Sequence, residues 1–144
     1  MFIPFQNEPR LISLPVLAST PDLFYDVELA HAIDASNART GALHVRLHTR
    51  LSANNTHAIL MVLAFPILPF DSAVDTRFQG PTAVLTAGGN GITYADSPAG
   101  TLVVGTPADL CVPALRIVLR LTTDEQAATV EDSISLSGGV VLTN

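Results

Sequence analysis

Residues 44–51 alternate strictly between polar and mostly apolar side chains. Positions 44, 46, 48 and 50 carry two histidines and two arginines, and three of the four positions 45, 47, 49 and 51 are aliphatic. Successive side chains of a β-strand point to opposite faces. The run therefore predicts a strand with one mostly apolar face and one basic face that carries the histidines and arginines. The run 114–121 repeats the pattern with Arg116 and Arg120.

The remainder of the chain is typical of further short strands between turn residues. Their regular spacing predicts an all-β fold, an antiparallel β-sandwich or jelly-roll-like barrel of about 8–10 short strands. The strands are expected over 24–33, 42–51, 57–65, 82–87, 92–95, 101–106, 116–122, 133–137 and 140–143. The expected common core comprises Val45, Leu47, Met61, Leu63, Ile117, Leu119 and Leu121.

The connection over residues 52–56 has the length of a common hairpin loop. Such a hairpin would pair the strands on either side of it and set Leu47 opposite Met61. The arginine face would then include apolar neighbours, with Arg46 opposite Val62, and would be only half suited to water.

Two glycine-rich stretches and one polar stretch predict the remaining connections. Gly88–Gly91 and the Gly138-Gly139 pair favour tight turns, because Gly and Asn accept positive φ. A phosphate-binding loop at Gly88–Gly91 is the weaker interpretation, because no Lys-Ser/Thr and no helical pattern follow it. A capping-box pattern favours a short helix over 124–131.

Residues 1–22 carry four prolines among eight large apolar side chains. Proline removes a backbone donor and biases its predecessor towards extended geometry. The pattern predicts an extended N-terminal arm over 1–22, followed by a β-sandwich domain over 23–144. Exposed apolar surface costs about 25 cal/mol per Å², so the arm must lie on its own domain or on a neighbouring chain. We expect the neighbouring chain.

The composition points towards buried contacts with other subunits. Hydrophobic residues make up 48% and charged residues 14% of the chain, and the mean hydropathy is +0.40. A glycine- and alanine-rich β-protein with a neutral polar surface of Thr, Ser and Asn is the alternative interpretation. All seven cationic residues are arginine, the usual cation of interfaces. The formal net charge of −6 argues against general nucleic-acid binding.

No arrangement of residues selects a catalytic or metal site. His44 and His48 would lie about 13 Å apart along a strand, too far to share one zinc ion. Cys111 has no histidine near it in sequence, and its apolar setting predicts a buried, inert thiol. We expect no catalytic residues, no metal and no cofactor. The N-terminus lacks a signal-peptide pattern, and the longest apolar run, over 58–69, is too short to cross a bilayer.

These observations leave three classes of function. The favoured hypothesis is a non-enzymatic structural protein of a large assembly, most plausibly a virus or bacteriophage particle: a minor capsid, decoration (cement) or tail protein. Its partners would be copies of itself and a larger assembly with, for example, a major capsid protein, and neither nucleic acid nor membrane. It would be located in the virion, or in the cytoplasm if it is not viral.

The second hypothesis is a ligand- or carbohydrate-binding β-sandwich module. The absence of Trp and the small number of Tyr and Phe, two and six, weaken it. The third is an enzyme on a jelly-roll scaffold, which would need clustered histidines.

The subunit contacts expected under the first hypothesis combine the apolar arm with the arginine strands. At least two of the strand arginines should pair with carboxylates, either Asp26 and Glu28 or those of another subunit. The residues expected at the interface are Phe2, Ile3, Phe5, Leu11, Ile12, Arg46, Arg50, Arg116 and Arg120.

Overall fold

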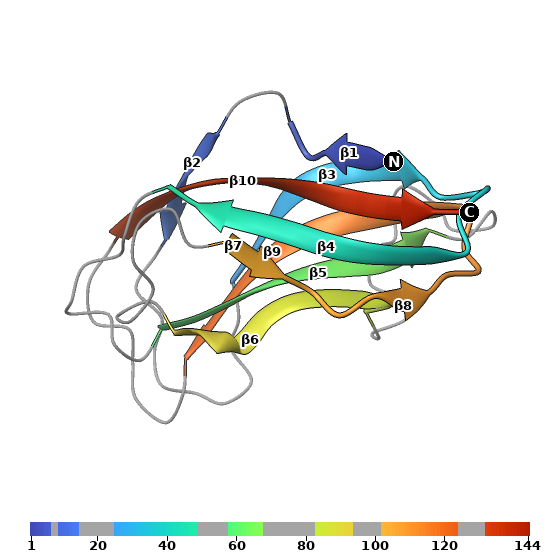
Figure 1. Cartoon of the computed structure of the whole chain (residues 1–144). Coiled ribbons are helices and arrows are strands. Elements are labelled where there is room, and N and C mark those ends of the chain that lie inside the picture. The colour runs from blue at the N-terminus through green and yellow to red at the C-terminus, as the bar shows by residue number, and fades with distance from the viewer. Residues whose placement is uncertain (7–8, 15–24, 49–57, 68–82, 94–101, 124–131) are drawn as a thin grey trace.

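Ten β-strands and no helix run through the described residues of the computed structural model, which are 1–6, 9–14, 25–48, 58–67, 83–93, 102–123 and 132–144. None of these residues belongs to a helix that could cross a membrane. The strands form two antiparallel sheets stacked on each other (Figure 1). In chain order they are β1 (Phe2–Pro4), β2 (Arg10–Leu14), β3 (Tyr25–Asp34), β4 (Thr40–Leu47), β5 (Ala58–Ile67), β6 (Leu85–Thr93), β7 (Leu102–Val104), β8 (Ala108–Asp109), β9 (Ala114–Thr123) and β10 (Asp132–Thr143).

The first sheet is built on β10 and β4, which pair along eight positions from Leu136↔Leu47 to Thr143↔Thr40. β1 and β2 both pair with the other side of β10 and form one interrupted edge strand. β7 and β8 pair with β4 and form a second interrupted edge.

The second sheet has the order β3-β9-β5-β6. β9 and β5 pair over ten positions without a shift, from Ala58↔Thr123 to Ile67↔Ala114. β3 pairs with β9 with two register shifts, between Glu28 and Ile33.

Alternate aliphatic side chains of both sheets fill the space between them. Val45 from β4, Ile134 from β10 and Ile117 from β9 are each at most 1% exposed. This arrangement confirms the predicted all-β antiparallel sandwich. The same core includes Leu43, Leu47, Leu60, Val62, Leu115, Leu119, Leu121, Leu136 and Val140.

The predicted hairpin between residues 42–51 and 57–65 is wrong. β4 pairs with β10, β7 and β8, whereas β5 pairs with β9 and β6, so the two strands lie in different sheets. Both faces of β5 are apolar, and alternation therefore did not reveal which face meets the core. The inward residues of β5 are Leu60, Val62 and Ala64. Met61 and Leu63, expected in the common core, belong to a separate cluster with Val118.

Both predicted glycine turns are also wrong, because the glycines lie inside strands. Gly88–Gly91 falls within β6, where Met61↔Gly88 is followed by Ile59↔Thr93, so that β6 carries three more residues than β5 across this irregularity. Gly138 and Gly139 lie in the middle of β10. Glycine inside a strand often marks a bulge or a close approach of another backbone.

At Gly139 the close approach comes from the N-terminal strand β1, and at Gly138 it comes from β4 and from the ring of Phe5. A Cβ atom on Gly139 would lie 2.4 Å from the carbonyl oxygen of Ile3 and 2.6 Å from the ring of Phe2. A Cβ atom on Gly138 would lie 2.4 Å from the carbonyl oxygen of His44 and 2.9 Å from the ring of Phe5. Gly139 thus makes room for β1 and the ring of Phe2, and Gly138 makes room for the backbone of β4 and the ring of Phe5.

The described residues of the N-terminal segment lie on the sandwich. The Phe5 N–H donates to the Gly138 carbonyl, and the Leu142 N–H donates to the Met1 carbonyl, each over 2.8 Å. Ile12 is 3% exposed and belongs to the core. The division into an arm over 1–22 and a domain over 23–144, and the docking of the arm on another chain, stay predictions. The expected helix over 124–131 lies outside the described residues.

The close packing of β1 against Gly139 of β10 can be tested with Gly139→Ala. We expect a loss of about 1–3 kcal/mol in the free energy of unfolding, because the new methyl group meets backbone, and faster hydrogen exchange at the Phe5 and Leu142 amides. Gly41→Ala is the matched control, because its methyl group meets only the flexible ends of leucine side chains, the nearest at 2.7 Å. Equal losses for both variants would contradict this role of Gly139.

The inward face of β9 can be tested with Leu119→Ala. Leu119 is 2% exposed, and truncating a buried leucine costs roughly 2–5 kcal/mol. Leu11→Ala, at a side chain that is 70% exposed, should change the free energy of unfolding by less than about 0.5 kcal/mol. Urea denaturation of both variants measures the difference, and a small loss for Leu119→Ala would show that the face is assigned wrongly.

Candidate interaction surfaces

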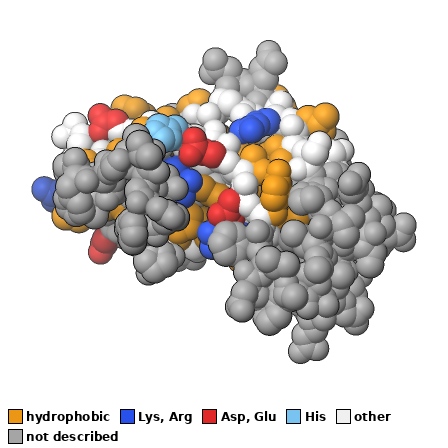
Figure 2. All heavy atoms as spheres, turned by 180° about the vertical axis from the view of Figure 1, so that it is seen from behind, with side chains coloured by type: hydrophobic (Ala, Val, Ile, Leu, Met, Phe, Trp, Pro, Cys, Tyr) orange, Lys and Arg blue, Asp and Glu red, His pale blue; other side chains and the backbone are white. Residues whose placement is uncertain are grey.

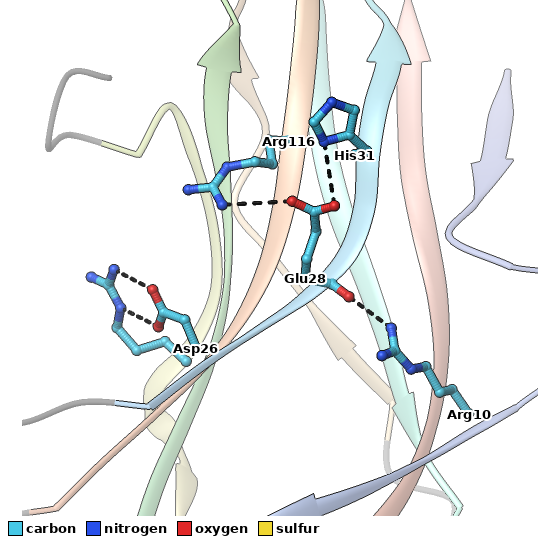
Figure 3. Close-up of polar contacts among 6 residues, drawn as sticks. Arg10, Asp26, Glu28, His31 and Arg116 are labelled. Carbon is cyan, nitrogen blue, oxygen red and sulfur yellow. Dashed lines mark hydrogen bonds and ion pairs between the residues drawn. The ribbon is translucent and has the colours of Figure 1, made fainter. Parts of the chain in front are cut away.

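The outer face of the second sheet carries arginines that are already paired with acids (Figure 3). Arg120 on β9 stands opposite Asp26 on β3 in the register. Its Nε and Nη2 donate to the two carboxylate oxygens of Asp26, each over 2.9 Å. This two-point geometry is the strongest form of an arginine–carboxylate contact.

Glu28 on β3 is the centre of a second, looser group. Its carboxylate lies 3.7 Å from Nη1 of Arg116 and 3.3 Å from Nδ1 of His31. Its backbone carbonyl accepts a hydrogen bond of 2.7 Å from Arg10, which reaches across from the first sheet. The prediction that at least two strand arginines pair with Asp26 and Glu28 is therefore confirmed.

Both arginines also flank one aromatic ring. The guanidinium carbons of Arg116 and Arg120 each lie 5.6 Å from the ring centroid of Phe65, within the range of a cation–π contact. Phe65 is 6% exposed and forms a buried cluster with Leu63 and Val118. Nε of Arg116 is buried without a hydrogen-bond partner. In the view from behind, charged side chains and a histidine lie next to hydrophobic ones (Figure 2).

The outer face of the first sheet is different, because four large hydrophobic side chains are exposed on it. The register places Arg46 between Ser137 of β10 and Leu102 of β7, and His44 beside Val104. Leu102 and Val104 are 49% and 54% exposed. Phe2 and Leu11, on the opposite edge of this sheet, are 53% and 70% exposed. These four residues, together with His44, Arg46, His48 and Ser137, are called the apolar face below.

The apolar face is hollowed beside Arg46. A hollow of about 440 Å³ is lined by Phe2, Pro4, His44, Arg46, Leu102 and Ser137, among others. His48 shares a hydrogen bond of 2.6 Å with Ser137. Within the part of the chain that the structure describes, Arg46 forms neither an ion pair nor a side-chain hydrogen bond. The hollow therefore combines an aromatic ring and an aliphatic side chain with a cation that has no ion-pair partner among the described residues.

The expected interface residues consequently divide among three environments. Phe2, Leu11 and Arg46 lie on the apolar face, whereas Arg116 and Arg120 lie on the outer face of the second sheet. Ile3, Phe5 and Ile12 pack in or against the core. Arg46 and the two β9 arginines thus lie on the outer faces of different sheets. Arg50 lies outside the described residues.

Sequence reasoning missed Leu102 and Val104 as surface residues. Three consecutive aliphatic residues, 102–104, give no alternation by which the outward side chains could be recognised. Cys111, expected to be buried, is exposed. Its neighbour Leu110 is the residue that enters the core, at 7% exposure.

Two acidic residues are exposed at the end of the sandwich where β3 turns into β4. Asp34 accepts hydrogen bonds from the hydroxyl group and the N–H of Ser36, over 2.6 and 2.9 Å. These bonds, the hydroxyl first, lower the pKa of the Asp34 carboxyl below its usual value. Asp109 lies opposite Thr40 in β8. No group of three or more His, Cys, Asp or Glu within the described ranges could hold a metal ion.

Comparison with known proteins gives a fold resemblance alone. No family model and no curated protein matches the chain. Among solved structures, one chain of "Structure of infectious bursal disease virus Gx strain" aligns with 97% of this chain at 17% identity and a TM-score of 0.45. The aligned part is 30% of that chain, so this protein spans less than a third of its length. No function follows from a similarity of this size.

The contribution of the Asp26–Arg120 pair can be measured with a double-mutant cycle. Both side chains are partly exposed, at 29% and 23%, so we expect a coupling free energy near the upper end of the usual range, about 0.2–1 kcal/mol. The matched cycle on Glu28 and Arg116, whose closest atoms lie 3.7 Å apart, should give a smaller value. A larger coupling for the second pair would contradict the ranking by geometry.

Proposed function

We propose that this protein is a non-enzymatic structural component of a large assembly, of the kind that builds a virus particle, and that it acts through contacts between protein subunits. The observation that carries the proposal is the apolar face. Four of the large hydrophobic side chains that are exposed among the described residues, Phe2, Leu11, Leu102 and Val104, share this face.

Single exposed apolar residues are normal, but a concentration of them on one face marks an interaction site. At about 25 cal/mol per Å², covering these side chains favours association. Arg46 adds a directional element, because interfaces are enriched in arginine and in aromatic residues. The low charge of the whole chain, 14%, supports the same proposal.

The viral part of the proposal rests on an analogy between folds. Double-sheet antiparallel β-proteins build viral capsid domains, and also lectin domains, so the architecture by itself does not select a function. Within a particle, we propose a minor capsid, decoration or tail role. Copies of this chain and a major capsid protein would then be its partners, and the virion its location.

The hollow beside Arg46 favours one second candidate, a ligand- or carbohydrate-binding module. Its volume of about 440 Å³ lies within the usual range of ligand pockets, about 300–1,000 Å³. Among the described residues that line it, Phe2 is the one Phe, Tyr or Trp, which is few for a sugar site. This candidate requires a soluble monomer that binds a small molecule.

The size of the purified protein, measured by sedimentation velocity, separates the two candidates. We expect a dimer, trimer or larger ring, and Leu102→Asp combined with Val104→Asp should shift it to monomer without unfolding. The control combines Ala32→Asp with Asn37→Asp, which adds the same charge at exposed positions away from the apolar face. A wild-type protein that stays monomeric at high concentration would overturn the assembly role and favour the binding module.

A further inference from the structure

The outer face of the first sheet carries two opposite charges at the two ends of the strip formed by β4, β7 and β8. Arg46 lies at one end of β4, and Asp109 in β8 lies opposite Thr40 at the other end. Positions 40 and 46 are six residues apart, about 20 Å along a strand. Neither Arg46 nor Asp109 has an ion-pair partner among the residues that the structure describes.

Asp109 points to the same side of the sheet as Arg46. Its neighbour Ala108 packs against the core and pairs with Gly41, whose missing Cβ atom would meet core leucines. Because successive side chains alternate, Asp109 points outwards, and it is exposed. Val104 and Leu102 lie on the same edge between Asp109 and the Arg46 end.

The strip is self-complementary, because a cation lies at one end and an anion at the other. Two copies turned end to end can therefore pair their opposite charges. A two-fold axis in the plane of the interface, perpendicular to β4 and near Leu43, exchanges the two ends of the strip. Arg46 of one copy would then face Thr40 of a second copy, one strand spacing of about 4.8 Å from that copy's Asp109. A guanidinium on its three-carbon stem reaches across such a spacing. Val104 of each copy would lie close to the axis.

We propose that the β7/β8 side of the outer face of the first sheet is the contact surface of a symmetric dimer of this chain. In this dimer Arg46 of each copy pairs with Asp109 of the other. The inference rests on the proposed function and deepens it by naming a second copy as the partner. The two ion pairs flank an apolar centre of Leu102 and Val104. In a two-fold contact the same patch serves both subunits, so each pair occurs twice.

The contrast with the second sheet supports the choice of surface. There, Arg116 and Arg120 find acids within the chain, and their charges are satisfied without a partner. On the first sheet the corresponding cation and anion lie too far apart to reach each other. A second copy brings Arg46 and Asp109 together, whereas no rotation of their side chains within one chain can.

Charge reversal tests the pairing, with sedimentation velocity as the readout. Arg46→Asp and Asp109→Arg should each weaken the dimer at least about tenfold in Kd, because each creates two like-charge contacts. The double variant Arg46→Asp with Asp109→Arg should dimerise nearly as the wild type does. Ala32→Asp combined with Asn37→Asp is the control: it makes the same change in net charge at exposed positions outside the proposed contact and should leave Kd unchanged.

Mixing the two weakened variants gives the decisive measurement. Arg46→Asp carries acids at both ends of the strip, and Asp109→Arg carries arginines at both ends. A 1:1 mixture should therefore form heterodimers at least about tenfold more tightly than either variant forms homodimers. Circular dichroism of each variant checks that the fold is retained.

The possible failures differ from those of the proposed function. If the wild type oligomerises, and Leu102→Asp with Val104→Asp disrupts it, but the mixture shows no preference for heterodimers, the symmetric pairing is wrong and the assembly role stands. If double reversal fails to restore the dimer, the Arg46–Asp109 pairing is likewise overturned. A monomeric wild type would overturn the assembly role itself.

Discussion

The burial of alternate aliphatic side chains between the two sheets is the constraint on which the rest of the structure depends. Val45, Ile117, Leu121, Ile134 and Leu136 are each at most 2% exposed. A shift of one residue in any of these strands would turn its whole apolar set towards solvent. The core thus fixes the register, and the register decides which side chains remain outside. The outer faces are a consequence of the packing between the sheets.

The two outer faces differ in how their charges are satisfied. On the second sheet Asp26 and Glu28 meet Arg120 and Arg116, and Phe65 lies between the two guanidinium groups. Both arginines of that face find acids within one chain. The apolar face of the first sheet leaves Arg46 beside exposed aliphatic side chains and a hollow, and association with another chain would complete it. The proposed symmetric dimer follows from this difference.

The edges of the sheets make association by strand addition less favourable than association by a face. Both edges of the first sheet are interrupted: β1 and β2 form one, and β7 and β8 the other, with strands of two to five residues. β3 carries register shifts, and so does β6. Short and irregular edge strands are the usual protection against uncontrolled pairing. A chain that protects its edges and leaves an apolar face open is suited to contacts of defined geometry.

The sequence by itself determined the fold class and the inward residues of β4 and β9, because alternation with period two is a local property of the chain. It also indicated that at least two strand arginines would pair with carboxylates, but it left open whether Asp26 and Glu28 or another subunit would supply them. Only the tertiary structure decided which strands share a sheet. β5 is apolar on both faces, so alternation did not show which of its faces meets the core, and the expected hairpin with β4 was wrong. The glycines at 138 and 139 favour a turn locally, but the strand continues because Phe2 and Phe5 occupy the space that side chains would need. Those contacts join residues more than 130 positions apart, and no local pattern encodes them.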